Sequence, residues 1–95
     1  MAPENRAGED LSMRRRRLRY RAWRRGTREL DLILGPFADA TIAAMSEAEL
    51  ERLERLLDLD ETTLQQWLLG LAPPPPEADG ELIARILTHK LSTTR

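Results

Sequence analysis

Residues 45–57 read MSEAELERLERLL and carry every local signal of an amphipathic helix. Ser46 suits the N-cap position, and Glu49 completes a capping box three residues later. Met45 and Leu50 flank this start as a hydrophobic staple. One helical face then holds the leucines at positions 50, 53, 56 and 57. The segment therefore predicts a short helix that buries a single leucine face.

Similar spacing on both sides of this segment predicts four further helices. They are expected at residues 13–25, 28–44, about 60–71 and about 80–91. Pro36 interrupts the second of them, but its apolar spacing continues, which favours a kink over a break. In the helix that Asp60 caps, the residues expected to be buried are Leu64, Trp67, Leu68 and Leu71. Four prolines at 73–76 predict a stiff, extended connector before the last helix.

These elements predict an all-α fold, a compact five-helix bundle in a single small domain. The domain is expected at residues 13–91, after a disordered tail at 1–12 and before a frayed C-terminus at 92–95. The short helices lack heptads, which favours a monomer. The longest uncharged stretch is far too short to span a bilayer, and the first residues lack the apolar run of a secretory signal. We therefore expect a cytoplasmic protein that does not enter a membrane.

The composition disfavours an enzyme. The 95 residues include no cysteine and one histidine, which excludes disulfides, thiolate chemistry and a cluster of histidine metal ligands. His89 has no obvious serine or acidic partner nearby in the sequence, and we expect it to be exposed or to cap a helix. Ser46 is occupied as a cap, so a serine nucleophile is not expected. The glutamates at 47, 49, 51 and 54 interleave with arginines, which is typical of a solvated helix face with weak ion pairs.

The net charge of −1 hides a strong asymmetry. Residues 1–28 hold ten arginines and three acidic residues, a net charge of +7, whereas residues 29–95 carry −8. The arginine run at 13–28 is compatible with binding nucleic acid through stacked Tyr20 or Trp23, with lying on a membrane surface, and with docking on a protein. A further alternative is that it packs on the chain's own acidic body. The acidic remainder disfavours nucleic acid, because it repels phosphates.

Residues 25–29, RGTRE, form the most specific local feature. Gly26 allows a sharp turn between the first two helices. Glu29, in the first turn of the second helix, and Arg25, at the end of the first, each complement a helix dipole. These positions predict a carboxylate and a guanidinium side by side at an exposed corner. On local physics alone, the alternative is an ordinary pair of helix-capping charges.

Residues 17–21, RLRYR, and residues 25–31, RGTRELD, resemble the signature of the succinate dehydrogenase FAD assembly factors, the SdhE family of small five-helix proteins. Its hallmark is R-G-x-x-E, often preceded by L-x-Y-R and followed by a further acid. The similarity spans about residues 14–90. Thr63 departs from the family, many members of which carry a second acid there, and the departure is expected to weaken the helix cap slightly. Trp23 matches no fixed family position.

The resemblance implies a function. Such factors bind the flavoprotein subunit of succinate dehydrogenase, and in some bacteria fumarate reductase, and promote covalent attachment of FAD to a histidine of that subunit. The partner holds the FAD, while the factor binds no cofactor or metal and is a chaperone rather than an enzyme. By the same resemblance, six residues form or support the contact corner: Arg25, Gly26, Glu29, Arg17, Tyr20 and Asp31. A nucleic-acid-binding regulator and a generic interaction module are the alternatives.

Overall fold

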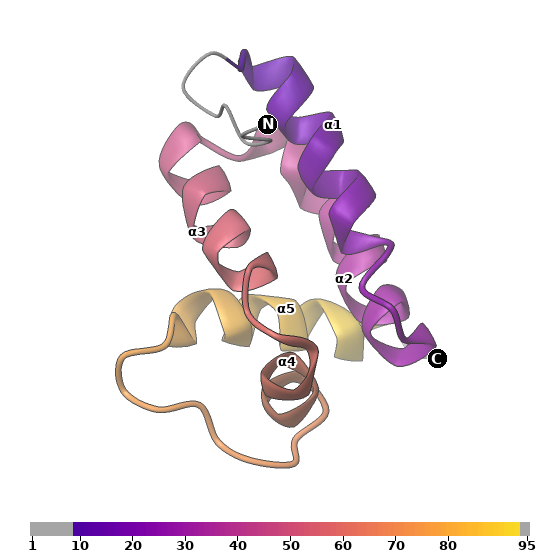
Figure 1. Cartoon of the computed structure of the whole chain (residues 1–95), viewed down its shortest axis with the longest axis vertical. Coiled ribbons are helices and arrows are strands. Elements are labelled where there is room, and N and C mark those ends of the chain that lie inside the picture. Colours follow the sequence, from indigo (N-terminus) through magenta and orange to yellow (C-terminus); the bar gives the residue numbers. More distant parts are fainter. Residues whose placement is uncertain (1–8, 94–95) are drawn as a thin grey trace.

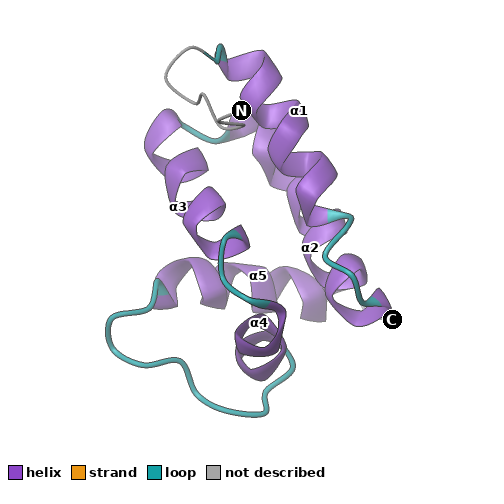
Figure 2. Ribbon diagram, viewed as in Figure 1, coloured by secondary structure: helices purple, strands orange, loops and turns teal. Residues whose placement is uncertain are grey.

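The computed structural model describes residues 9–93, and all regular structure in this part of the chain is helical (Figure 1, Figure 2). The elements, in chain order, are α1 (Leu11–Ala22), α2 (Arg28–Thr41), the 3-10 turn η2 (Ile42–Ala44), α3 (Glu47–Leu57), α4 (Glu61–Leu68) and α5 (Gly80–Thr93). The predicted all-α fold with five helices is confirmed. Residues 1–8 of the predicted tail, and the last two residues of the predicted frayed end, lie outside the described residues.

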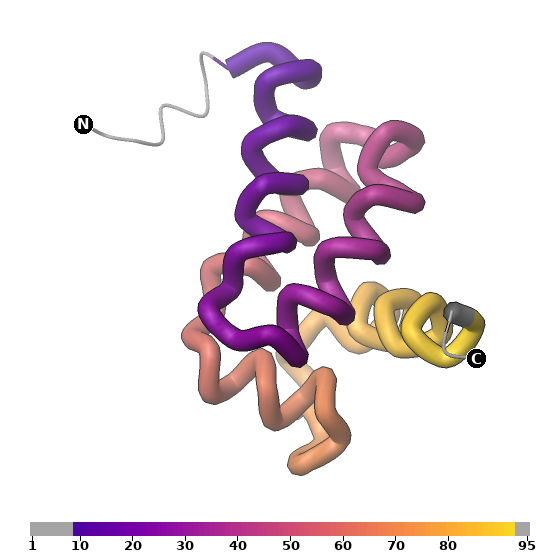
Figure 3. Tube along the Cα trace, turned by 90° about the vertical axis from the view of Figure 1, so that its right-hand side faces the viewer, coloured from indigo at the N-terminus to yellow at the C-terminus, as the bar shows by residue number. Residues whose placement is uncertain are grey.

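α1 packs against α2 and α3, and α5 packs against α2 and α4. α1 and α2 form an antiparallel pair, and α1 also packs against α3 (Figure 1). α5 crosses this pair near one end and contacts α2 and α4 (Figure 3). The link between α4 and α5, residues 69–79, holds the proline run and loops away from the bundle without helical structure (Figure 2). None of the helices in residues 9–93 combines the length and the apolar content that crossing a bilayer requires.

The core is built mainly of leucine and isoleucine from all five helices. α1 contributes Leu18 and Ala22, and Phe37 of α2 is the largest fully buried side chain among the described residues. Leu71, which the sequence predicted to be buried, is 71% exposed. The reason is that α4 ends at Leu68 and that Gly70, with a φ of +76°, turns the chain away.

The starts of α3 and α4 follow the predicted caps. The Ser46 N–H donates to Glu49 Oε1 at 2.8 Å and the Glu49 N–H donates to Ser46 Oγ at 3.1 Å, so the capping box is confirmed. Asp60 caps α4 by accepting a bond from the Thr63 N–H at 3.2 Å. The Thr63 hydroxyl donates a second bond to Asp60 at 2.6 Å. Thr63 therefore adds a bond to this cap.

α1 begins and ends earlier than predicted. The Asp10 carboxylate accepts a hydrogen bond from the Met13 N–H at 2.8 Å, so the helix begins at Leu11, inside the stretch predicted to be a disordered tail. The helix ends at Ala22, and residues 23–27 form a loop rather than a last helical turn. In this loop, Arg25 bonds to Asp31 of α2 and to the Leu57 carbonyl at the end of α3, and these contacts stabilise its non-helical conformation.

Trp23 and Gly35 join α1 to α2. The Trp23 indole lies so close to Gly35 that an added Cβ would stand 2.2 Å from the ring. The indole Nε1–H also donates to Asp39 Oδ2 at 3.2 Å. Gly35 is therefore required for the close approach of the indole, and Trp23, which matches no fixed family position, holds the two helices together. α2 runs through Pro36 to Thr41 and is not broken at the proline, as expected.

Candidate docking surface

The loop between α1 and α2 forms an exposed bend at Gly26. Gly26 has a φ of +106°, in the left-handed region that favours glycine. A Cβ at this position would lie 3.1 Å from Glu61 Oε1, so space is also restricted on one side. Thr27 then caps α2, its hydroxyl accepting a bond from the Leu30 N–H at 3.3 Å. The predicted sharp turn is confirmed, and Gly26 is accessible from outside.

Arg25 points into the protein, which corrects the predicted corner. Its Nη1 donates to the Leu57 carbonyl at 2.8 Å and its Nη2 donates to the Leu59 carbonyl at 3.0 Å. These carbonyls lie at the end of α3, where unpaired acceptors attract a cation. The Arg25 backbone N–H donates to Asp31 Oδ1 at 2.6 Å. Arg25 therefore fixes the bend against α3, and its guanidinium is not paired with the Glu29 carboxylate at the surface.

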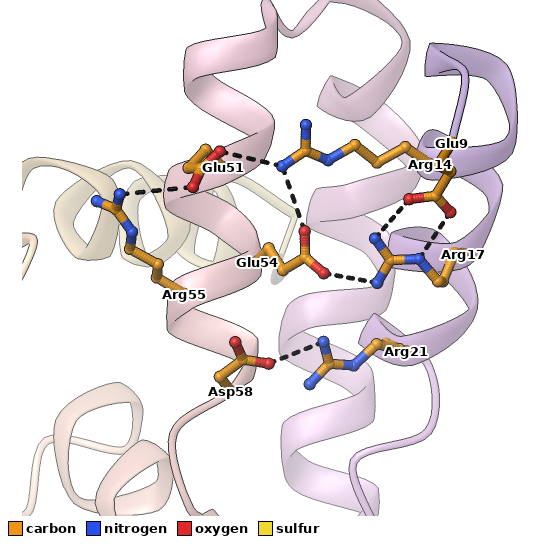
Figure 4. Close-up of polar contacts among 8 residues, drawn as sticks. All are labelled: Glu9, Arg14, Arg17, Arg21, Glu51, Glu54, Arg55 and Asp58. Atoms are coloured by element: carbon orange, nitrogen blue, oxygen red, sulfur yellow. Dashed lines mark hydrogen bonds and ion pairs between the residues drawn. The ribbon is translucent and has the colours of Figure 1, made fainter. Parts of the chain in front are cut away.

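Arg17 is also bonded within the chain (Figure 4). Its Nε and Nη2 donate to the two Glu9 oxygens at 2.8 Å each, and its Nη1 donates to Glu54 Oε2 at 2.6 Å. Hydrogen bonds to Glu9 and then Glu54 raise the pKa of Arg17 above its usual range. Glu54 is only 1% exposed, so its predicted place on a solvated face is wrong. It is buried because α1 packs on α3 and covers it.

Within residues 9–93, five arginines of the run face the body of the protein, and we call them the inner arginines: Arg14, Arg15, Arg17, Arg21 and Arg25. Arg14 donates to Glu51 and to Glu54 at 3.3 Å each, and Arg21 pairs with Asp58 at 3.0 Å (Figure 4). Arg15 and Arg21 also donate to backbone carbonyls that follow α2 and end α3. Five of the nine arginines at 13–28 therefore pack on the body, one of the alternatives that the sequence left open.

The six predicted contact residues fall into two groups. Those bonded within the chain are Arg17, Arg25 and Asp31. Those left at the surface are Gly26, Glu29 and Tyr20, the last of which is 61% exposed. Glu29 lies in the first turn of α2, as predicted, and its carboxylate makes no hydrogen bond or ion pair with any residue between 9 and 93. The second group lies open at the surface, and Asp31 of the first group also lines the surface beside Gly26, so its bond within the chain does not remove it from the predicted contact.

Two further residues at this surface were not predicted. The Arg24 guanidinium lies 4.6 Å from the centre of the Tyr20 ring, in a cation–π contact. Leu32 is 53% exposed, and the signal for it was available, since it falls outside the apolar spacing of α2. Both residues line a shallow depression of about 550 Å³ beside Gly26. We call Tyr20, Arg24, Gly26, Glu29 and Leu32 the docking surface.

His89 lies on α5 and is half-buried rather than exposed. Its ring meets Phe37 edge-on, with the ring centres 5.9 Å apart. The expectation of an exposed histidine is therefore wrong, because the last helix packs against α2 at this point. The imidazole ring therefore packs against Phe37 of α2.

Acid is expected to weaken the fold through two carboxylates that arginines hold. Hydrogen bonds from Arg17 lower the pKa of Glu9, and those from Arg52 lower the pKa of Asp79. Because both pKa values are about 4 in an unfolded chain, the pairs stabilise the fold above about pH 5 and lose this effect as the pH falls through the lower folded values. Urea unfolding at a series of pH values should show the free energy of unfolding falling below about pH 4.

Asp79→Asn is the control for this prediction. The amide keeps an oxygen that can accept the Leu82 N–H bond at the start of α5, which Asp79 Oδ1 makes at 3.1 Å. The substitution removes the titrating carboxylate, so the free energy of unfolding should fall less in acid than it does in the wild type. An identical pH dependence in Asp79→Asn and the wild type would contradict the assignment to Asp79.

These features define a class, a small all-α protein whose most distinctive surface is an exposed bend between two helices. Residues 16–90 match the model of the family described as flavinator of succinate dehydrogenase, Sdh5, and the matched range includes the whole bend. The chain belongs to this family, and the family predicted from the sequence is confirmed.

Individual relatives agree with this assignment. The chain is 37% identical over 81 residues to the FAD assembly factor SdhE of Acetobacter pasteurianus, covering 85% of this chain and 74% of that protein. It is 34% identical over 74 residues to the FAD assembly factor SdhE of Aliivibrio fischeri, covering 78% and 86%. It is 38% identical over 71 residues to the mitochondrial succinate dehydrogenase assembly factor 2 of Aspergillus terreus, covering 75% of this chain but 24% of that protein. No solved structure matches the chain.

Proposed function

We propose that this chain is an assembly factor that binds the flavoprotein subunit of succinate dehydrogenase and promotes covalent attachment of FAD to it. The observation that carries the proposal is the exposed Gly26–Glu29 bend in a chain of the flavinator family. The names of the relatives from Acetobacter pasteurianus and Aliivibrio fischeri support the same role.

In this proposal the chain assists the reaction without performing it. The flavoprotein holds the FAD and supplies the histidine that becomes bonded to it. Docking of the bend lowers the free energy of an arrangement of the flavoprotein in which the flavin and the histidine are correctly placed. A ligand shifts such an equilibrium only through its differential affinity, and a tenfold shift needs about 1.4 kcal/mol. Three further points stay predictions: the fumarate reductase flavoprotein as a second partner, the monomeric state and the cytoplasmic location.

The test is the amount of flavin that stays on the flavoprotein after denaturation. The flavoprotein subunit is expressed with the wild-type chain, with Glu29→Ala or without the chain, and covalent flavin is read by fluorescence in a denaturing gel. We expect a strong band with the wild type, a weak band without the chain, and a band reduced several-fold with Glu29→Ala. The Glu29 side chain is exposed and unbonded to described residues, so its removal should not affect folding.

Glu47→Ala is the matched control, because Glu47 is an exposed glutamate in the first turn of α3. It removes the same group from the same kind of helical position, away from the bend. We expect full flavin attachment with this variant. Equal bands with and without the wild-type chain would refute the proposed function. Equal bands with Glu29→Ala and Glu47→Ala would refute the role of the bend's carboxylate.

A further inference from the structure

Eight of the nine arginines at 14–28 fall into two sets with different surroundings, and the ninth, Arg19, is half exposed with its Nε 4.0 Å from Asp39 Oδ1. Each inner arginine is bonded to carboxylates or carbonyls of the body. Three others, Arg16, Arg24 and Arg28, are exposed and form no ion pair with any residue in the range 9–93. Carboxylates or backbone carbonyls therefore hold the first set, whereas no carboxylate between residues 9 and 93 compensates the charge of the second set.

The uncompensated arginines form one continuous strip with Tyr20. Arg16 and Tyr20 are four residues apart on α1, which places them on one face of the helix. Arg24 lies over the Tyr20 ring at 4.6 Å, and Arg24 and Arg28 line the same shallow depression. We call these four residues the outer strip. It starts on α1 and ends at the first residue of α2, next to Gly26 and Glu29.

We propose that the outer strip binds an acidic surface of a partner protein, and that it steers the chain to that partner by electrostatic attraction. Arginine forks grip carboxylates in a bidentate manner, and tyrosine and arginine are enriched at the centres of protein interfaces. Exposed Leu32 beside the strip offers the apolar contact that such an interface also uses. The inference rests on the proposed function in taking the flavoprotein subunit as the partner, and it adds the chemistry of the partner's surface.

The surroundings of the strip favour a protein over a nucleic acid. Three free arginines neutralise few phosphates, and the exposed Glu29 carboxylate beside Arg28 would repel a phosphate backbone. Arg24 already covers one face of the Tyr20 ring, which leaves one face for stacking on a base. A protein surface that carries separate carboxylates fits this mixture of charges and apolar groups.

The experiment measures binding of the full chain to the flavoprotein subunit from the same organism by surface plasmon resonance, from about 50 to about 500 mM salt. We expect the association rate of the wild type to fall at least tenfold over this range. Arg16→Glu and Arg24→Glu should each weaken binding at low salt by about tenfold and flatten the salt dependence. Arg55→Glu is the matched control, because the Arg55 side chain is 74% exposed on α3, and it should bind like the wild type.

Each outcome is distinguishable. Tight binding by the wild type and by both reversed variants alike would overturn this inference and leave the proposed function standing. No binding by the wild type would overturn the proposed function and this inference with it. Labelled single-stranded and duplex DNA serve as a second ligand, and we expect no binding at physiological salt. DNA binding that Arg24→Glu abolishes, together with unchanged flavoprotein binding, would overturn the inference in favour of a nucleic-acid partner.

Discussion

Gly26→Arg is expected to abolish flavin attachment while leaving the helices in place. The residue has a φ of +106°, which costs an L-amino acid about 1–2 kcal/mol. A Cβ would also meet Glu61 Oε1 at 3.1 Å, so the backbone of the bend or the glutamate must move. The long charged side chain would then stand on the bend beside the depression that Gly26 lines with Arg24 and Leu32, where we place the partner. The variant therefore combines a modest loss of stability with a blocked docking surface.

Gly70→Arg separates these two effects. Gly70 also has a positive φ, +76°, but a Cβ there would meet no atom within 4 Å, and the residue lies in the loop after α4. The control carries a similar backbone strain and the same added charge, away from the bend. We expect Gly70→Arg to lose the part of the stability that backbone strain causes, which urea unfolding measures, and only Gly26→Arg to lose covalent flavin in the gel assay.

Gly26→Ala should give an intermediate result, since it adds the strain and little bulk. Loss of flavin attachment in Gly70→Arg as well would show that reduced stability, rather than the bend, is responsible. Full attachment with a correctly folded Gly26→Arg protein would remove the bend from the docking surface.

The parts of the fold that local chemistry determines could be predicted. A cap depends on residues three positions apart, and both Ser46 with Glu49 and Asp60 with Thr63 form their bonds within one turn. The buried leucines of α3 likewise follow from helical spacing. Gly26 was predictable for the same reason, because a sharp turn needs a residue that tolerates positive φ.

Which arginines bond within the chain and which stay exposed could not be predicted in the same way, because this depends on contacts between residues distant in sequence. Glu54 looks like its exposed neighbours on α3 until α1 packs over it, some 40 residues away in the chain. Arg25 was predicted at the surface because the sequence does not show that the end of α3 lies beside the bend. One usable signal was present: Leu18 and Ala22 are the buried positions of α1, and the arginines that flank them on the helix face the body.

Removing Glu54 is expected to have the largest effect on stability among exchanges outside the apolar core. The Glu54 carboxylate is 1% exposed and binds Arg17 at 2.6 Å and Arg14 at 3.3 Å (Figure 4). Glu54→Ala leaves two cations facing an apolar void, and breaking a buried ion pair in this way typically costs about 3–5 kcal/mol. We expect the low end, about 3 kcal/mol, because Arg17 keeps Glu9 and Arg14 keeps Glu51.

Glu51→Ala is the matched control, since Glu51 lies one turn earlier on α3 and binds the same Arg14 at 3.3 Å, but is 52% exposed in its side chain. An exposed pair contributes at most about 1 kcal/mol. Urea unfolding followed by far-UV circular dichroism should therefore show a large loss for Glu54→Ala and a small one for Glu51→Ala. Glu54→Gln, which keeps the shape and one acceptor oxygen, should fall between them.

The consequence for function follows from the position of the pair. The Arg14–Glu54–Arg17 contacts hold α1 on α3, and Arg25 holds the bend on the end of the same helix. Loosening α1 should therefore also displace Tyr20 and Gly26, and Glu54→Ala should reduce flavin attachment even at temperatures where it remains folded. Equal stability of Glu54→Ala and Glu51→Ala would show that apolar packing through Leu18 and Ala22 alone holds α1 in place.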